Sequence, residues 1–241
     1  MDLQLKGKTV LVTGGSKGIG LACAKAFAAE GCRLHLAARN RERLDEAARA
    51  VGGASVHAVD LRDGGALRQL ARDCADVDIL VNNAGDIPGG TIETLDETKW
   101  RQAWELKVYG FINLTRELYP RMKAKKSGVI VNVIGMAGET HPFEYICGAT
   151  ANAGLAAFTK AMGKGSREHG VRVVGLHPPS TRTDRIITLM KAAAKAKWGD
   201  ESRFEELMGN VIEPEQVGDT VCFLASPRAG QLSGVVLNLG A

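Results

Sequence analysis

The chain has 241 residues, a formal net charge of +4 and 45% hydrophobic residues. This composition excludes a disordered chain, because it supplies enough apolar side chains to bury a core. This net positive charge is weak, and the sequence contains no run of five like charges, so no nucleic-acid partner is expected. No stretch of about 18 apolar residues occurs, so no membrane span is expected either.

The five cysteines are scattered along the chain, and no C-x-x-C motif is present. No pair of cysteine and histidine residues has the spacing of a zinc site, so no metal is expected. An odd number of scattered cysteines suits a reducing compartment. The N-terminal segment has too short an apolar run for a signal peptide. These features predict a cytoplasmic protein.

Short apolar runs rich in β-branched residues alternate along the chain with longer segments of helical period. The predicted strands are 9–13, 33–38, 55–59, 79–81, 129–133, 172–176 and 235–239. The predicted helices are 17–30, 41–51, 65–74, 97–123, 146–169 and 214–224. Strand and helix alternation indicates βαβ units, and apolar runs without alternation are typical of strands covered on both faces. We therefore expect residues 1–241 to form a single α/β domain, a doubly wound parallel sheet with helices on both faces.

Residues 180–210 interrupt this alternation with charged helical pieces after the sixth strand. An open α/β sheet has its ligand crevice at the carboxyl ends of its strands. The segment is therefore interpreted as a substrate lid, and the alternative is an ordinary surface excursion.

The first predicted strand runs into a glycine-rich turn that opens a helix, with the sequence Thr13-Gly14-Gly15-Ser16-Lys17-Gly18-Ile19-Gly20. Such a turn lets backbone N–H groups approach a pyrophosphate, and the helix N-terminus adds partial positive charge. The spacing is T-G-x-x-x-G-x-G, in the strand–turn–helix context of a dinucleotide site. It predicts a dinucleotide site in which Gly14, Ser16, Lys17, Gly18, Ile19 and Gly20 take part.

The end of the second strand indicates which dinucleotide binds. An acidic residue at this place would accept a hydrogen bond from the ribose 2′-OH of NAD, but the strand ends in Ala38-Arg39-Asn40. The guanidinium of Arg39 suits a 2′-phosphate, and Lys17 is a second candidate cation. NADP(H) is therefore favoured over NAD(H). The alternative for Arg39 is a surface ion pair with the following helix.

Three further motifs occur in order: Asn82-Asn83-Ala84-Gly85, Tyr145 at the start of a long helix, and His177-Pro178-Pro179-Ser180-Thr181-Arg182-Thr183. Together with the glycine loop, they make the chain resemble the short-chain dehydrogenase/reductase family over essentially its whole length. The resemblance implies a Rossmann-like sheet in strand order 3-2-1-4-5-6-7. It also implies hydride transfer between a nicotinamide and an alcohol or carbonyl carbon of a small molecule.

Several cofactor roles follow from the resemblance. It implies that Asp60 and Leu61 meet the adenine, and that Asn83, Ala84 and Gly85 lie beside the adenosine ribose. It also implies that Thr183 contacts the nicotinamide carboxamide or the diphosphate. The Pro-Gly pair of the family reads Pro178-Pro179 here, which restricts the backbone of this cofactor-binding turn.

The family's catalytic residues match only in part. Its acid/base tyrosine corresponds to Tyr145, but the residue four positions later is Ala149 instead of lysine. The serine position reads Gly135, and the position of a relay asparagine reads Lys107. One interpretation is that the Lys107 ammonium fills the space left at Ala149 and acts as a catalytic cation; the other is that it extends to solvent. The gap between Gly135 and Tyr145 is also short for the family, so a third interpretation is that the alignment of this loop is shifted.

Other residues of this region have two interpretations each. Thr140 or His141 would replace the missing serine, or both belong to a loop surface. Asn152 lies two helical turns beyond Tyr145 and either binds a relay water or packs. Cys147 lacks a matched base and is interpreted as a small buried residue.

The sequence thus predicts an NADP(H)-dependent oxidoreductase with an atypical active site. The alternative is a dinucleotide-binding relative without turnover that acts as a sensor or partner subunit. The helix after Tyr145 is rich in glycine and alanine, and the family pairs its fourth and fifth helices between subunits. A homodimer or homotetramer is therefore expected.

Overall fold

Seven parallel strands form one sheet in the order β3-β2-β1-β4-β5-β6-β7 in the computed structural model, which describes residues 1–240 apart from the side chains at 192 and 196. The strands are β1 (Thr9–Thr13), β2 (Arg33–Ala38), β3 (Ser55–Ala58), β4 (Ile79–Asn82), β5 (Gly128–Val133), β6 (Val171–His177) and β7 (Val236–Asn238). The predicted strands and their order are confirmed, with differences of one residue at some ends.

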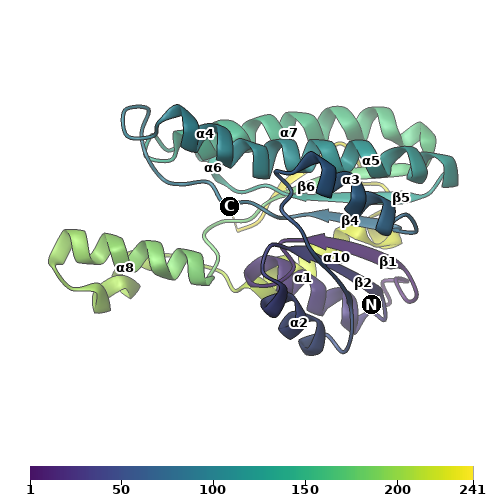
Figure 1. Ribbon diagram of the computed structural model, residues 1–241, viewed down its shortest axis with the longest axis horizontal. Helices are drawn as coiled ribbons and strands as arrows, with labels where there is room; N and C mark the ends of the chain where they lie inside the picture. The colour runs from purple at the N-terminus through teal and green to yellow at the C-terminus, as the bar shows by residue number, and fades with distance from the viewer. Residues whose placement is uncertain (241) are drawn as a thin grey trace.

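Helices cover both faces of this sheet (Figure 1). One face carries α1 (Gly18–Ala29), α2 (Arg41–Ala50) and α10 (Pro214–Ala225), and the other carries α3 (Gly64–Asp73), α4 (Glu97–Trp104), α5 (Gly110–Lys125) and α7 (Ile146–Ser166). A separate apolar core fills each layer, with Phe27 and Val221 on the first face and Leu67 and Leu114 on the second. Among the helices of residues 1–240, none has the length and apolar character that crossing a membrane requires.

The long helix predicted at 97–123 contains an irregular turn. A π-helical segment, η1 (Glu105–Tyr109), separates α4 from α5 and carries Lys107 at its centre. A π-turn accommodates an extra residue, so it changes the direction in which the side chains of that turn point. Such turns are frequent at functional sites. The pattern of apolar residues in the sequence did not predict this one.

Helix α8 (Asp184–Trp198) projects away from the body of the molecule, in green at the left of Figure 1. It packs against the short helices η3 (Glu201–Phe204) and α9 (Glu205–Met208). The Trp198 ring lies 4.2 Å from the Arg203 guanidinium carbon and 4.8 Å from the Lys197 ammonium nitrogen, so cation–π contacts hold the tip of this unit together. The projecting unit coincides with the segment predicted as a lid.

A buried chain of polar side chains fixes α5 and α7 to the centre of the sheet. The Asn82 amide donates to Thr115 of α5 at 3.2 Å and to Asn132 of β5 at 2.9 Å, and the Asn132 amide donates to Thr159 of α7 at 2.9 Å. Buried polar groups of this kind favour one arrangement, because a shifted helix leaves them without partners. The two helices that flank the candidate site therefore have a defined position at the carboxyl ends of β4 and β5.

Candidate active site

The glycine loop after β1 has the backbone that a diphosphate site requires. Gly14 and Gly18 have positive φ angles of 66° and 54°, and a Cβ atom at Gly20 would overlap the Gly14 carbonyl oxygen. Lys17 precedes α1 without a side-chain hydrogen bond to the helix, whereas Asn40, Asp63 and other side chains of the described chain cap the starts of later helices. The first N–H groups of α1 are therefore available to an anion, and the loop fits a dinucleotide.

The hydroxyl of Thr13 ties this loop to the segment after β4. It accepts hydrogen bonds from the backbone N–H groups of Asn83 at 2.9 Å and Ala84 at 3.1 Å, and it donates to the Val81 carbonyl at 3.2 Å. The Asn83 amide donates to the Thr13 carbonyl at 3.0 Å. The structure thus brings two of the motifs that the sequence singled out into direct contact.

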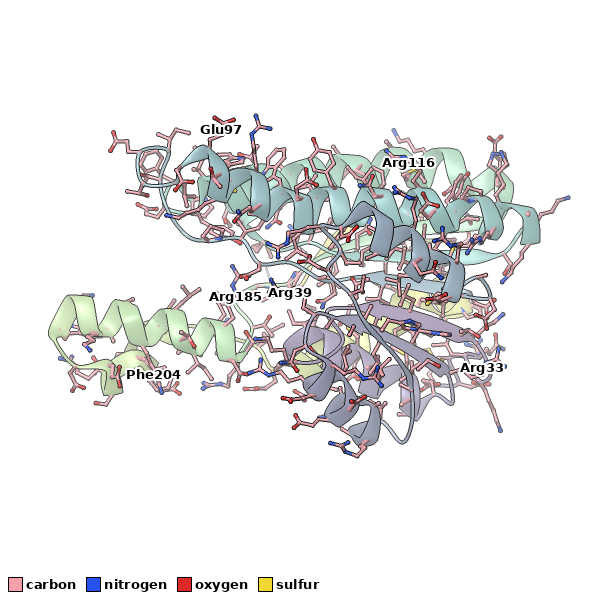
Figure 2. All side chains as sticks on the ribbon, viewed as in Figure 1. Arg33, Arg39, Glu97, Arg116, Arg185 and Phe204 are labelled. Atoms are coloured by element: carbon pink, nitrogen blue, oxygen red, sulfur yellow. The ribbon has the colours of Figure 1, made fainter. Side chains whose placement is uncertain are left out.

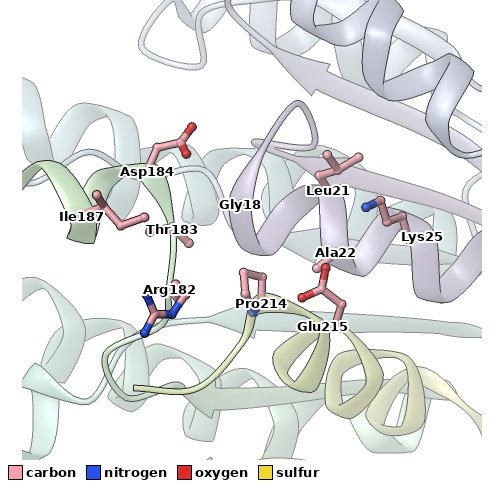
Figure 3. Close-up of a pocket in the computed structure, with 10 residues that line it drawn as sticks. All are labelled: Gly18, Leu21, Ala22, Lys25, Arg182, Thr183, Asp184, Ile187, Pro214 and Glu215. Atoms are coloured by element: carbon pink, nitrogen blue, oxygen red, sulfur yellow. The ribbon is translucent and has the colours of Figure 1, made fainter. Parts of the chain in front are cut away.

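A third motif reaches the same place from the base of α8. Thr183 caps α8, and its methyl carbon lies 3.2 Å from the position of a Cβ atom at Gly18. Figure 3 shows the groove beside this contact, lined by α1, by the segment 182–187 and by the start of α10. The base of α8 therefore borders the predicted diphosphate site.

Arg39 lies at the carboxyl end of β2 and is half exposed. Its guanidinium is 4.0 Å from the Asp86 carboxylate, a loose pair, so the alternative partner on the following helix is not the one found. Arg62 contacts Asp60 at 2.6 Å, and this hydrogen bond holds the pKa of the Asp60 carboxyl below its usual value. Figure 2 shows Arg39 and Arg185 on the side of the body from which α8 projects.

The Tyr145 side chain lies over its own helix. Tyr145 precedes the first residue of α7 with non-helical φ and ψ angles of −137° and 35°. A Cβ atom at Gly148 would overlap Cε1 and Cζ of its ring, so the ring occupies the place of a side chain at position 148. The phenol therefore lies about one helical turn further along α7 than a side chain that began at the first turn of the helix.

Arg185 is the cation beside this phenol, and the sequence analysis did not identify it. Burial raises the pKa of Tyr145 above its usual value, and the Arg185 guanidinium opposes the rise through its positive charge and a hydrogen bond. Arg185 also donates to the Ile87 carbonyl, which joins the first turn of α8 to the loop after β4. The only signal in the sequence was its place two residues after Thr183.

Lys107 points into the site instead of toward solvent. Its ammonium donates to the Ile134 carbonyl at 2.5 Å, and its aliphatic carbons pack against Gly85. Burial, with a smaller effect of the Arg185 charge, lowers the pKa of Lys107 to about 7. The interpretation that it extends to solvent is therefore wrong. Its catalytic role stays a prediction.

The Lys107 ammonium does not fill the space beside Ala149. Ala149 lines an apolar hollow on the other side of the α7 turn, with Pro142, Phe143 and Ile146. The residue of α7 that faces Gly135 is Asn152, four residues after Gly148. The position expected for the lysine was counted from Tyr145, but the ring lies at position 148, so the residue four positions further along the helix is Asn152 and not Ala149.

Gly135 and Asn152 form the inner wall of the site. Gly135 has a φ angle of 127°, and a Cβ atom there would lie 2.9 Å from Nδ2 of Asn152. The Gly135 carbonyl accepts a hydrogen bond from Asn152 Nδ2 at 3.2 Å and lies 2.6 Å from Nδ1 of His177. Within residues 1–240, the buried Oδ1 atom of Asn152 has no hydrogen-bond partner. It therefore presents a free acceptor beside the site.

The other candidates have ordinary structural surroundings. Thr140 is exposed and donates to the Met136 carbonyl of its own helical turn, and His141 is exposed with a φ angle of 49°. Cys147 is buried, and burial raises the pKa of its thiol. These surroundings favour the structural interpretation of all three residues.

Comparison with known proteins agrees with this arrangement of motifs. Residues 8–194 match the family described as short chain dehydrogenase. The chain belongs to the short-chain dehydrogenase family. Members of this family transfer a hydride between a nicotinamide dinucleotide and a CH–OH or C=O group, and this protein is accordingly an oxidoreductase.

Individual members of the short-chain dehydrogenase family match along nearly their whole length. An uncharacterized oxidoreductase, YvrD, of Bacillus subtilis is 32% identical and covers 97% of this chain and 95% of its own. Galactitol 2-dehydrogenase (L-tagatose-forming) of Cereibacter sphaeroides is 31% identical, with 97% and 94% covered. The crystal structure of L-sorbose reductase from Gluconobacter frateurii with NADPH and L-sorbose has a TM-score of 0.93 at 29% identity, covering 99% of this chain and 97% of its own.

The packing of Tyr145 on Gly148 generates a test. Gly148→Ala places a methyl group where the ring now lies, so the phenol has to move out of the site. We expect kcat to fall by about 10²-fold or more, the contribution of a positioned acid/base group, while the Kd for the dinucleotide stays within about twofold.

Gly154→Ala on the same helix is the matched control, because a Cβ atom there meets nothing within 4 Å. This variant is expected to keep its kcat and to gain up to about 1 kcal/mol of stability. Equal kcat values for the two variants would contradict an acid/base role of the Tyr145 phenol.

Proposed function

We propose that this protein is an NADP(H)-dependent carbonyl reductase with an altered acid/base site. The observation that carries the proposal is the Tyr145 phenol, held over Gly148 with the Arg185 guanidinium beside it at the carboxyl edge of the sheet. The same edge carries the glycine loop and Thr183, so an acid and a dinucleotide site adjoin. When bound, the nicotinamide supplies the hydride.

The electrostatics of Tyr145 favour carbonyl reduction. Because burial raises its pKa, the phenol is protonated at neutral pH and is ready to donate a proton to the oxygen of a reduced carbonyl. The Arg185 charge makes the phenol a stronger acid than burial alone would allow, and it stabilises the phenolate that remains. In the reverse reaction, alcohol oxidation, the phenol would first have to lose its proton to accept one from the alcohol, and its raised pKa opposes this loss.

We assign the altered residues by their places around this phenol. The ring at position 148 and Asn152 four residues later reproduce the spacing of the family's tyrosine and lysine. Asn152 supplies an amide instead of an ammonium, and its unpaired Oδ1 suits a relay water or a substrate hydroxyl. Gly135 leaves the room that the Asn152 amide occupies. The positive charge comes from Arg185, with Lys107 as a second cation close enough for the two charges to interact.

The relatives suggest the class of substrate. L-sorbose in the reductase structure and galactitol in the related dehydrogenase are small polyhydroxylated molecules. Arg185 lies beside the phenol, and Lys107 and Asn152 bond to the adjacent carbonyls of Ile134 and Gly135. These polar groups suit hydroxyl groups near the reacting carbon. We propose a small hydroxylated ketone as the substrate, and L-sorbose and L-tagatose are the first compounds to assay.

Arg39 supports the choice of NADP(H). Its guanidinium is half exposed, is only loosely paired with Asp86 and stands at the end of β2, where a ribose 2′-phosphate would lie. Lys17 is exposed in the glycine loop and offers a second positive charge. A 2′-phosphate would replace the weak Asp86 contact with charge-assisted hydrogen bonds.

Calorimetric titration of Arg39→Ala tests this preference. The loss of a charged hydrogen-bond donor is expected to weaken NADPH binding about 10- to 100-fold and to leave NADH binding within about twofold. Arg41→Ala removes an exposed guanidinium that pairs with Asp45 at 3.0 Å, and it should change neither affinity. Equal losses for both dinucleotides would show that Arg39 does not read the phosphate.

A second experiment tests the acid and its cation. Tyr145→Phe is expected to lower kcat for NADPH-dependent reduction by about 10²- to 10⁴-fold, and Arg185→Met by about 10- to 100-fold, with the NADPH Kd unchanged in both. Lys195→Met, which removes an exposed charge on the same helix, is the control and should keep full activity.

If wild-type protein binds NADPH but reduces none of a broad panel of ketones, the dinucleotide-binding alternative replaces the proposal. If Tyr145→Phe turns over like wild type, another residue donates the proton.

The pKa of Lys107 predicts a pH dependence of reduction. Below about pH 7 the amine is a cation and strengthens the positive potential around the reacting oxygen, and above it the amine is neutral. We therefore expect kcat/KM to fall several-fold as the pH rises through about 7. Lys107→Met should be slow and flat over this range, and Lys99→Met, whose lysine is exposed, should follow wild type. A transition that persists in Lys107→Met would assign it to another group.

A further inference from the structure

Two histidines and a cysteine meet at the edge of the sheet, well apart from the site described above. His35 and His57 lie on neighbouring strands β2 and β3, and Cys74 directly follows α3. The start of β2, marked by Arg33 in Figure 2, lies on the opposite side of the body from Arg185. The register pairs Ala37 with His57, so the two histidines are diagonal neighbours on one face.

Their ligand atoms converge on one point. Nδ1 of His35 is 3.0 Å from Nε2 of His57, and Sγ of Cys74 is 3.7 Å from the same Nε2 atom. All three atoms lie within 4.8 Å of one another. A tetrahedral Zn²⁺ ion has bonds of about 2.0 Å to nitrogen and 2.3 Å to sulfur, which separate two nitrogen ligands by about 3.3 Å and a nitrogen from a sulfur ligand by about 3.5 Å. The two contacts to His57 Nε2 differ from these values by about 0.3 Å or less, and Nδ1 of His35 and Sγ of Cys74, at most 4.8 Å apart, have to approach each other when the ion binds.

The surroundings of the cluster resemble those of a metal site. The second ring nitrogen of His35, Nε2, is 3.8 Å from the Asp76 carboxylate, and this carboxylate accepts a hydrogen bond from the Thr9 hydroxyl at 3.4 Å. At 3.8 Å this carboxylate lies just beyond hydrogen-bond distance, and a carboxylate that accepts a bond from a histidine ligand fixes the orientation and tautomer of its ring. Cys74 is fully buried and the His35 side chain is 16% exposed, so the site is enclosed yet reachable from solvent.

We propose that His35, His57 and Cys74 bind one Zn²⁺ ion, with a water molecule as the fourth ligand. Zn²⁺ matches a donor set of two imidazoles and one thiolate, and the thiol gives up its proton when the metal binds. The ion would join β3, which has β2 as its single neighbour in the sheet, to the end of α3. It would therefore stabilise the strands whose carboxyl ends carry Arg39 and Asp60.

Cobalt spectroscopy tests the proposal on the full chain. Protein treated with a chelator is titrated with Co²⁺ alone, and a thiolate-to-cobalt charge-transfer band is expected that saturates at one equivalent. Added Zn²⁺ should remove the band and raise the melting temperature. Cys74→Ser should lose the band, and Cys32→Ser should keep it, because Cys32 lies outside the cluster and its thiol donates to the Leu5 carbonyl.

A second variant, Asp76→Asn, keeps the test valid if Cys74→Ser fails to fold. Asp76 is exposed and ligates nothing in the proposal, so this variant should fold, keep the band and bind Co²⁺ about 10-fold more weakly. Absence of the band in folded wild-type protein would overturn the proposal. So would a band that survives in Cys74→Ser, or cobalt binding that requires no thiolate.

Discussion

The hydroxyl of Thr13 fixes the crevice in which the site is built. It lies at the end of β1 and holds the backbone of Asn83 and Ala84 after β4, so the two strands that flank the reversal of strand order have a defined separation. In a doubly wound sheet, ligands bind outside the carboxyl ends of the strands at this reversal. The glycine loop, Thr183 and the loop that receives Arg185 are all positioned around this anchor.

The unusual residues of the site depend on one another. Gly148 leaves room for the Tyr145 ring, and Gly135 leaves room for the Asn152 amide. The positive φ angle of Gly135 also requires glycine, whereas Gly148 is an ordinary helical residue whose missing side chain is explained by the Tyr145 ring. At each position a neighbouring side chain fills the space that a Cβ atom would enter. The volume of the proposed site is thus filled by Tyr145 and Asn152, which also supply its polar groups.

The sequence predicted the sheet, the glycine loop and the nucleotide motifs, because these depend on local patterns such as the buried run Thr9–Thr13. It did not predict the place of the Tyr145 ring, which follows from the non-helical backbone of one residue. Arg185 lies in a charged helical segment where a solvated face gives the same pattern. The histidine–cysteine cluster was missed because a zinc site was sought in the spacing along the sequence. His35 and His57 meet through strand register, and Cys74 reaches them from the end of α3; no local pattern encodes either arrangement.

Arg185 belongs to two parts of the molecule at once. It is in the first turn of α8, the helix that projects from the body, and its guanidinium stands beside the Tyr145 phenol. Any rotation of α8 about its base would therefore carry a positive charge toward or away from the proposed proton donor. The position of the projecting unit and the strength of this proposed acid would then be coupled, and turnover would depend on solvent viscosity wherever movement of α8, and not the chemical step, limits the rate.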